Sequence, residues 1–352
     1  MSWPINHHRP GDSVNYPRNC WWVAGFSKDI GHEPVGCWML DSPVVLYRTQ
    51  DGAVVAMDDR CPHRWAPLSK GKLIEDRIEC PYHGIQFEPD GSCAKIPTQT
   101  TILPKCKVKT YPVIESPPFV WLWLGDPGRI SECDPPADLS WAERKDWSIA
   151  SGRLRMAGNY MQLHDNVMDL THFGFVHRDT LGQLDWVKPP KVKLTGSTVH
   201  FRQEFTDRPL SDFHRQITGT PPDLPASRFA TDGTWVTPAL HLATETIEFD
   251  NPGAGEVDTY IMEVVHAVTP LGMTEYEYHF LVGWNVDLPA ELREALTPGI
   301  VSVFSQDKEL LEAIDRTVSR DSRGADLDEI HLKSDTPQLH ARRKLQELMD
   351  RE

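Results

Sequence analysis

The stretches Cys61-Pro62-His63-Arg64 and Cys80-Pro81-Tyr82-His83-Gly84 decide how the first part of this 352-residue chain folds. Each stretch supplies one cysteine and one histidine from what reads as a loop. A [2Fe–2S] cluster with two thiolates on one iron and two neutral imidazoles on the other needs this set of donors. The pattern therefore indicates a small domain built around a cluster, whose ligands are expected to be Cys61, His63, Cys80 and His83.

A structural zinc site is the main alternative, because Zn²⁺ also takes two cysteines and two histidines. Zinc fingers usually keep Cys with Cys and His with His, whereas each stretch here pairs one Cys with one His, and a Pro follows each Cys. Four unrelated core residues are the remaining interpretation, and two matched pairs argue against it. We therefore favour the cluster, and we expect the chain to move electrons.

The charge of the chain is acidic, with 36 Lys and Arg residues against 51 Asp and Glu residues and a formal net charge of −15. This balance repels phosphate groups, so we expect neither nucleic acid nor an anionic membrane as a partner. The sequence shows no apolar stretch that would span a bilayer and no charged-then-apolar leader. Its length suggests two domains.

Five cysteines remain once two are assigned to the cluster. Their odd number and scattered spacing do not resemble the disulfide framework of a secreted protein. We interpret them as ordinary buried thiols and expect a reducing, cytoplasmic location. These residues are Cys20, Cys37, Cys93, Cys106 and Cys133.

Residues 1–140 read as an all-β domain. Apolar runs at 44–47 and 54–57 flank a turn that carries Asp51-Gly52, and a second Asp-Gly turn, at 90–91, follows a run at 85–87. Asp-Gly between apolar runs is a strong hairpin signal. Another strand is expected at 119–124, and the polar, Pro-rich residues after it predict a linker. We place the domain boundary near residue 140.

Residues 141–352 combine helix and strand patterns. Apolar residues three or four positions apart predict helices over 158–172, 298–317 and 338–349. Long β-like runs lie between them, at 191–206, 235–249 and 260–284, the last interrupted at 270–272. Helices at both ends of an antiparallel sheet predict an α+β domain.

The first of these helices carries a second group of polar residues. Asn166, Asp169 and His172 recur every three residues, and His177 follows where the helix is expected to end. Such a stripe can be a solvated face, and both histidines can be core residues bonded to backbone carbonyls. Two histidines in this spacing can instead bind one metal with a distant carboxylate, which is the facial triad of non-haem Fe(II) oxygenases. An Fe(II) site that activates O2 would be a suitable acceptor for electrons from the cluster.

The run Asn166-Val167-Met168-Asp169-Leu170-Thr171-His172-Phe173-Gly174-Phe175-Val176-His177 resembles the iron-site helix of Rieske non-haem iron oxygenases. Within that family it is most similar to the branch that contains the vanillate and dicamba O-demethylase oxygenase components. The two Cys-Pro stretches resemble the Rieske loops of the family. Respiratory Rieske proteins add a disulfide-forming cysteine to each loop, and Ala66 and Tyr82 occupy those places here. The resemblance covers essentially the whole chain.

The resemblance implies a fold and a third iron ligand. The fold is an N-terminal all-β Rieske domain, residues 1–140, followed by an antiparallel-sheet helix-grip (START-like) catalytic domain, residues 141–352. In the family the carboxylate ligand lies on a late helix, in a segment like 306–312 of this chain. This makes Asp307 the expected partner of His172 and His177 at a mononuclear iron.

Two further residues acquire roles from the same resemblance. Asp169 resembles a carboxylate that bridges a cluster histidine, here His83, and an iron-binding histidine, here His172. In the family this bridge crosses a subunit boundary, which implies a head-to-tail homotrimer. Asn166 resembles a residue that faces the iron without binding it firmly.

The function implied is that of the terminal oxygenase component of a multicomponent Rieske monooxygenase. O2 is the co-substrate, and electrons from NADH arrive through a separate reductase or ferredoxin, since the chain has no Gly-x-Gly-x-x-Gly nucleotide fingerprint. The expected reaction is hydroxylation of a methoxy- or N-methyl-substituted aromatic compound, which releases formaldehyde. A ring-hydroxylating oxygenase is the alternative. An electron carrier with a scaffold domain and a zinc-containing binding module are further candidates, and metal analysis would separate them.

Substrate contacts can be named only from the strand pattern. His266 and Trp284 are the expected pocket residues, and the same strands could also offer His241, His279 and Asn285. Each is more often a core residue than a ligand contact. The segment 207–232 is rich in Pro and Gly, so we expect a long, irregular loop there that acts as a lid.

Overall fold

The computed structural model describes residues 16–178, 180–181, 188–221, 223–250, 257–321, 323 and 329–352. The chain forms two compact units. Among the described residues, the first consists of 17–143 with the short segment 269–272, and the second of 144–268 and 273–352 with Tyr16.

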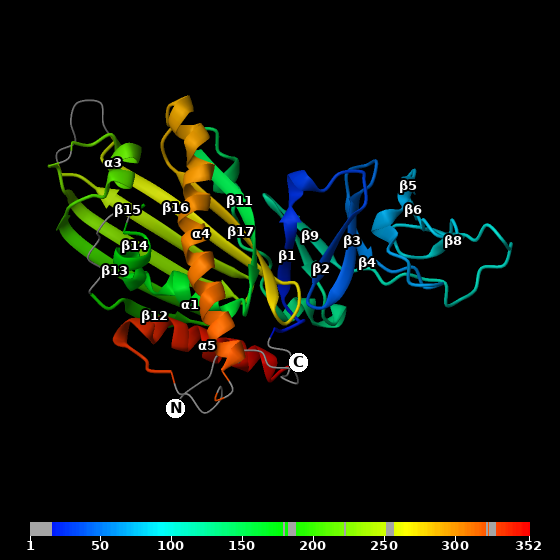
Figure 1. Cartoon of the computed structure of the whole chain (residues 1–352). Helices are drawn as coiled ribbons and strands as arrows, with labels where there is room; N and C mark the ends of the chain where they lie inside the picture. The colour runs from blue at the N-terminus through cyan, green and yellow to red at the C-terminus, as the bar shows by residue number, and fades with distance from the viewer. Residues whose placement is uncertain are drawn as a thin grey trace. The chain divides into compact units, whose positions relative to one another are not determined.

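The first unit consists of three small antiparallel sheets, with the strand orders β1-β10-β9, β2-β3-β4 and β5-β6-β7-β8 (Figure 1). The predicted Asp-Gly turns are confirmed between β3 and β4 and between β7 and β8. Gly91 has a positive φ of 79°, and a Cβ there would lie 2.1 Å from the Val108 carbonyl oxygen, so only glycine fits. The strands are β1 Trp21–Phe26, β2 Val35–Met39, β3 Ser42–Arg48, β4 Val54–Asp58, β5 Lys72–Ile74, β6 Arg77–Glu79, β7 Gln86–Phe87, β8 Cys93–Lys95, β9 Val113–Ser116 and β10 Phe119–Trp123.

The second unit is built on one seven-stranded antiparallel sheet with the order β11-β17-β16-β15-β14-β13-β12. Strands β12 to β17 lie side by side in the order of the sequence, and β11 forms the edge strand beside β17. The strands are β11 Ser148–Ala157, β12 Lys191–Thr195, β13 Thr198–Arg208, β14 Ala226–Thr237, β15 Leu240–Glu248, β16 Thr259–Pro270 and β17 Glu275–Trp284.

Helices cover the sheet of the second unit, and α4 runs across its strands (Figure 1). Leu296, Ile300, Val303 and Leu311 of α4 are buried, three, four or eight residues apart, and Asp307 lies within the same buried series. Its apolar stripe therefore faces the sheet and carries one carboxylate with it. The helices are α1 Met161–Met168, α2 Phe173–Val176, α3 Asp212–Thr218, α4 Ala290–Arg320 and α5 Thr336–Met349; the 3-10 turns are η1 Ser27–Asp29, η2 Leu68–Lys70, η3 Pro127–Glu132, η4 Ser140–Glu143, η5 Leu170–His172 and η7 Lys333–Asp335.

The fold class is confirmed, whereas several element limits differ from those expected. The run 191–206 is a hairpin whose turn has Gly196 at φ 58°, and 235–249 spans the turn between β14 and β15. The segment 207–232 is not a long irregular loop: it holds the end of β13, α3 and the first half of β14, while Pro222 lies outside the described residues. Apolar alternation does not mark these turns, because the residues on both sides of each are equally β-like.

Candidate metal centres and the cavity beside them

The two Cys-Pro stretches form matching loops in the first unit. One follows β4, and the backbone N–H of Trp65 donates to the Cys61 carbonyl; the other follows β6, and the N–H of Gly84 donates to the Cys80 carbonyl. Both cysteines are buried. Burial, followed by the neighbouring Cys80 thiol, raises the pKa of Cys61 to about 11, although backbone N–H groups oppose the shift. A cation beside this thiol would therefore be needed to ionise it near neutral pH.

The loop histidines meet at their ring nitrogens. Nδ1 of His63 lies 3.2 Å from Nδ1 of His83, and both side chains are exposed. The two thiols interact with each other and the two imidazole nitrogens meet, so the loops offer the two pairs of ligands that an iron–sulfur cluster with mixed ligands requires. The residues present fit this group.

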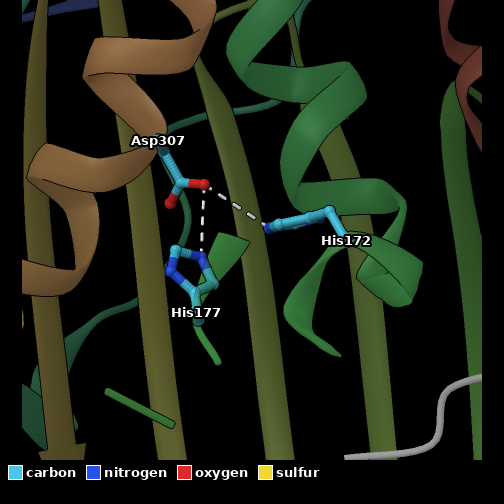
Figure 2. A group of neighbouring side chains, drawn as sticks. All are labelled: His172, His177 and Asp307. Atoms are coloured by element: carbon cyan, nitrogen blue, oxygen red, sulfur yellow. Dashed lines mark ion pairs between the residues drawn. The ribbon is translucent and has the colours of Figure 1, made fainter. Parts of the chain in front are cut away.

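A second set of donors lies in the other unit, where Asp307 of α4 faces two histidines (Figure 2). Its Oδ1 atom lies 3.2 Å from Nε2 of His177 and 3.5 Å from Nε2 of His172. One donor atom from each residue lies within 4.8 Å of the others, and these three form the one such group found among the described residues. Two imidazoles and one carboxylate on one side of a metal leave other coordination positions open. The three residues can hold a mononuclear iron.

A break in the helix positions the two histidines. α1 ends at Met168, and Asp169 takes an extended conformation, so the helix predicted over 158–172 is too long. The Asp169 carboxylate accepts hydrogen bonds from the backbone N–H of Thr171 at 2.9 Å and from its hydroxyl at 2.6 Å, which caps the 3-10 turn η5. This turn and the short helix α2 then carry the chain to His177.

Hydrogen bonds fix which ring nitrogen each histidine presents. Nδ1 of His172 lies 2.5 Å from the backbone carbonyl of Asp169, and Nδ1 of His177 lies 2.9 Å from Oε1 of Gln306. Since both partners are acceptors, each Nδ1 carries a hydrogen, and Nε2, which faces Asp307, is the atom that a metal can bind. The set is therefore prearranged for metal binding through Nε2.

Burial and charge act differently on the two rings. Burial lowers the pKa of His172 and favours the neutral ring that a metal binds. At His177 burial acts in the same direction, but the hydrogen bond to Asp307 and the charge of that carboxylate outweigh it and raise the pKa. A metal ion would compete with a proton for the Nε2 atom of His177.

Asn166 and Asp169 lie beside this set in different ways. Nδ2 of Asn166 donates to Oδ1 of Asp307 at 3.1 Å and lies 3.5 Å from Nε2 of His172. Asp169 contacts His172 through its backbone carbonyl, while its carboxylate binds Thr171 through Oδ1. Its bridging role through the carboxylate stays a prediction.

Sequence reasoning missed two residues of the site. Gln306 accepts from His177, and the hydroxyl of Thr180 donates to the same Gln306 oxygen at 3.0 Å. Gln306 directly precedes Asp307 in the sequence, and Thr180 lies three residues after His177. No periodic pattern in the sequence distinguishes either residue. For Gln306, its position next to the proposed ligand Asp307 on α4 is a signal that could have identified it.

Two family models match the chain. The Rieske [2Fe-2S] domain matches residues 20–112, and the vanillate O-demethylase oxygenase C-terminal domain matches residues 156–351. The chain belongs to the Rieske non-haem iron oxygenases. The oxygenase therefore has a [2Fe–2S] domain and a catalytic domain with a mononuclear iron site.

Relatives of the oxygenase are similar over most of their length. The iron-sulfur subunit of a toluene-4-sulfonate monooxygenase system from Comamonas testosteroni is 33% identical over 86% of this chain and 89% of its own. The vanillate O-demethylase oxygenase subunit of a Pseudomonas strain is 30% identical over 86% and 87%. The crystal structure of dicamba monooxygenase bound to 3,6-dichlorosalicylic acid gives a TM-score of 0.84 at 26% identity, covering 95% of this chain and 97% of that one. Another structure of that enzyme, with non-heme iron and dicamba, gives a TM-score of 0.79 at 25% identity over 95% and 97%.

A cavity of about 110 Å³ opens beside the metal-binding residues of the oxygenase. His266 lines it, and Nδ1 of this ring lies 2.7 Å from the hydroxyl of Tyr278. Trp284 lines a smaller neighbouring hollow and packs against Phe213. The cavity is bounded by Asn166, Val167, Leu170, His172, Phe173, His177, Leu181, Phe201, Phe213, His214, Thr231, Ala243, Glu245, Met262, Val264, His266, Val282, Ile300, Val303, Phe304 and Asp307.

The other expected pocket residues do not line this cavity. His241 is fully buried, and His279 is 2% exposed. The side chain of Asn285 bonds the backbone of Thr259 and Ile261, so it serves the sheet.

The names of these relatives, an oxygenase subunit and the iron-sulfur subunit of a monooxygenase system, describe components of multicomponent enzymes. In the part of the oxygenase that the structure describes, no helix is both long and apolar enough to cross a membrane. None of the seven cysteines forms a disulfide bond. Of the five outside the cluster loops Cys20 is buried, as expected, whereas Cys37, Cys93, Cys106 and Cys133 are partly exposed.

Proposed function

We propose that this oxygenase demethylates a methoxy- or N-methyl-substituted aromatic compound. The observation that carries the proposal is the mainly apolar cavity that meets His172, His177 and Asp307. An aromatic ring suits such walls, and the open side of the metal-binding residues meets the same space. Related O-demethylases support the choice of a methyl group as the point of attack.

In the proposal each site residue has one task. Cys61, Cys80, His63 and His83 hold the cluster, and His172, His177 and Asp307 hold Fe(II). When bound, the two groups supply O2 activation with electrons delivered one at a time. The described residues around them orient the ligands: Gln306 and the Asp169 carbonyl fix the two rings, and Asn166 neutralises part of the charge of Asp307 through its N–H.

The proposed reaction balances with one NADH for each methyl group. A methoxyarene, O2, NADH and a proton give a hydroxymethyl ether, water and NAD⁺. The hydroxymethyl ether then loses formaldehyde and leaves the phenol, with its proton passing from the hydroxyl group to the phenolic oxygen. An N-methyl substrate follows the same course to the amine.

We propose further that the oxygenase acts as a cytoplasmic homotrimer in which electrons cross between subunits. Oδ1 of Asp169 is used by Thr171, while Oδ2 accepts no hydrogen bond from the described residues. It is therefore available to a histidine of another subunit. Trp65 and Tyr82, on the two cluster loops, are 74% and 64% exposed, which suits a surface that a partner covers. A reducing compartment suits cysteines that form no disulfide bond.

The test combines the purified iron-loaded oxygenase, a ferredoxin-type reductase, NADH and O2 with a panel of methoxy- and N-methyl-aromatics. We expect formaldehyde in a one-to-one ratio to NADH consumed in excess of the substrate-free rate. Ring-hydroxylated products without formaldehyde would overturn the demethylation and would favour ring hydroxylation. Sedimentation of the same sample tests the trimer.

A further inference from the structure

One wall of the cavity carries a buried polar chain that the iron chemistry does not use. Nε2 of His214, on α3, lies 2.8 Å from Oε1 of Glu245 on β15, and Nδ1 of the same ring lies 2.6 Å from the Ser211 hydroxyl. His214 and Glu245 are 5% and 7% exposed, and both line the cavity. Burying a carboxylate costs free energy unless hydrogen bonds or opposite charges compensate it, and a single hydrogen bond to one histidine compensates only part of that cost.

The pairing of Glu245 is incomplete. Among the described residues, His214 is the one group that hydrogen-bonds this carboxylate, and the bond uses Oε1. Oε2 therefore retains its acceptor capacity, on a residue that lines the cavity. An ionised carboxylate accepts hydrogen bonds and donates none. The group that completes this site must be a donor.

A second polar group lies beside Glu245 on the neighbouring strand. Thr231 of β14 is the register partner of Glu245, so the two side chains share one face of the sheet, and Thr231 also lines the cavity. Its hydroxyl is buried and has no hydrogen-bond partner within the described part of the chain. A buried polar group without a partner is uncommon and points to a missing ligand or water.

The charges around the cavity have one sign. Of the described residues that line it, none is Lys or Arg, whereas Glu245 and Asp307 are both acidic. Asp307 is committed to the metal site, so Glu245 is the acidic group left to meet a ligand. A carboxylate or sulfonate placed against it would find no cationic side chain and would be repelled.

We propose that Glu245, with Thr231 beside it and His214 behind it, selects substrates that carry an N–H or O–H donor, neutral or cationic, and excludes aryl carboxylates and sulfonates. The inference rests on the proposed function, because it names the substrate class of that same cavity. His214 acts as a positioning residue, since it holds the carboxylate from the side of α3. The names of the toluene-4-sulfonate monooxygenase and the vanillate O-demethylase give anionic substrates, so this chain would differ from those two relatives in substrate charge.

Binding tests the proposal without turnover. The iron-loaded oxygenase is titrated anaerobically, without reductase, with meta and para isomers of four compounds that share one methoxyphenyl ring. Methoxybenzylamine and methoxybenzamide carry donors, whereas methoxybenzoate and methoxybenzenesulfonate are anions. We expect a donor compound to bind about tenfold or more tightly than either anion, the usual effect of a hydrogen bond to a charged group.

Two variants test whether Glu245 is responsible for the preference for donor compounds. Glu245→Gln keeps an acceptor for His214 but removes the charge, so the preference for donors should fall about tenfold. Glu263→Gln is the matched control. Glu263 lies on the neighbouring strand β16, where its register partner is Thr244, and it accepts a hydrogen bond from the Thr244 hydroxyl. This pair lies on the face of the sheet that Glu245 does not occupy. The ligand preference of Glu263→Gln should equal that of the unaltered oxygenase. Thermal unfolding of both variants checks that the fold is retained.

The possible outcomes separate this inference from the proposed function. Donor compounds that bind selectively but release no formaldehyde with reductase, NADH and O2 would overturn demethylation and leave the selectivity in place. Formaldehyde from methoxybenzoate at a rate unaffected by Glu245→Gln would support demethylation and overturn the selectivity. Equal binding of anions and donors, binding of no compound in the panel, or an equal loss of preference in both variants would also overturn it.

Discussion

Nδ1 of His177 donates a hydrogen bond to Oε1 of Gln306 across 2.9 Å, which joins a proposed iron ligand to the residue next to another. Gln306 directly precedes Asp307 on α4. One turn of this helix therefore supplies both the carboxylate and the group that fixes the opposing ring. Any shift of α4 along the sheet would move the ligand and its orienting residue together.

Replacing Gln306 with Leu is expected to weaken iron retention about 10- to 100-fold, because Nδ1 of His177 loses its acceptor and the ring can turn. The measurement is iron per chain after dialysis against graded chelator concentrations. The visible spectrum of the cluster should be unchanged, since the cluster loops lie in the other unit.

Two variants check this interpretation. Gln306→Glu keeps an acceptor for Nδ1 and should retain iron almost as well as the unaltered chain. Glu309→Ala changes an exposed residue of the same helix and should have no effect. Iron loss in Glu309→Ala equal to that in Gln306→Leu would mean that the helix, and not the hydrogen bond, had been disturbed.

The triad itself makes a sharper prediction. Asp307→Ala removes the anionic donor that faces both imidazoles, so the mononuclear iron should be lost and turnover abolished. Iron analysis should fall from about three to about two per chain, with acid-labile sulfide and the cluster spectrum intact. Loss of sulfide together with the third iron would show that Asp307 supports the fold and not the iron alone.

The expected iron ligands could be found from sequence because short motifs encode them. His172 and His177 lie five residues apart, and the segment around Asp307 resembles the family's late helix closely enough to single out one carboxylate. The structure brings these three together although 130 residues separate His177 from Asp307. The fold class followed in the same way, from helices before and after a series of β-like runs.

Other features depended on contacts that no local pattern contains. The break after Met168 comes from a side-chain cap at Asp169, which competes with the helix at a position where the apolar stripe continues. The pairing of Glu245 with His214 joins β15 to α3, a helix within the segment that had been expected to be irregular. Periodicity describes which face a residue occupies, not which residue from another element meets it there.

The last helix is held by an ion pair whose strength can be measured. Arg342 of α5 donates to both carboxylate oxygens of Asp165 on α1, and the two side chains are 14% and 16% exposed. Arg342→Met should lower the free energy of unfolding by about 3 kcal/mol, because it leaves a largely buried carboxylate unpaired. Urea unfolding followed by circular dichroism would measure the change.

A double variant separates the pair from packing. Asp165→Leu combined with Arg342→Met removes both charges, so it should be more stable than Arg342→Met alone. Arg343→Met alters an exposed position of the same helix and should change the free energy of unfolding by less than about 0.5 kcal/mol. A double variant no more stable than Arg342→Met would show that the arginine acts through packing.

Buried histidines should make the catalytic domain sensitive to acid. Burial lowers the pKa of His164 to about 4 and those of His266 and His279 to about 3, and it lowers the pKa of His241 well below its usual value. An unfolded histidine has a pKa near 6.5, so the unfolded state binds more protons once the pH falls below that value. The stability that these neutral histidines contribute is therefore fully present above about pH 6.5 and is lost as the pH falls towards about 3.

His241→Leu isolates one of these contributions. Neither ring nitrogen of His241 has a hydrogen-bond partner among the described residues, so the substitution removes a titrating group without breaking a bond. Each such histidine lowers the free energy of unfolding by about 1.4 kcal/mol for every pH unit below 6.5. Relative to its own value at pH 7.5, the variant should therefore retain about 2 kcal/mol more stability at pH 5 than the unaltered chain. His32→Gln changes an exposed residue of the other unit and should leave the pH dependence of stability unchanged. If His241→Leu loses stability with falling pH as steeply as the unaltered chain does, His241 is protonated in the folded state.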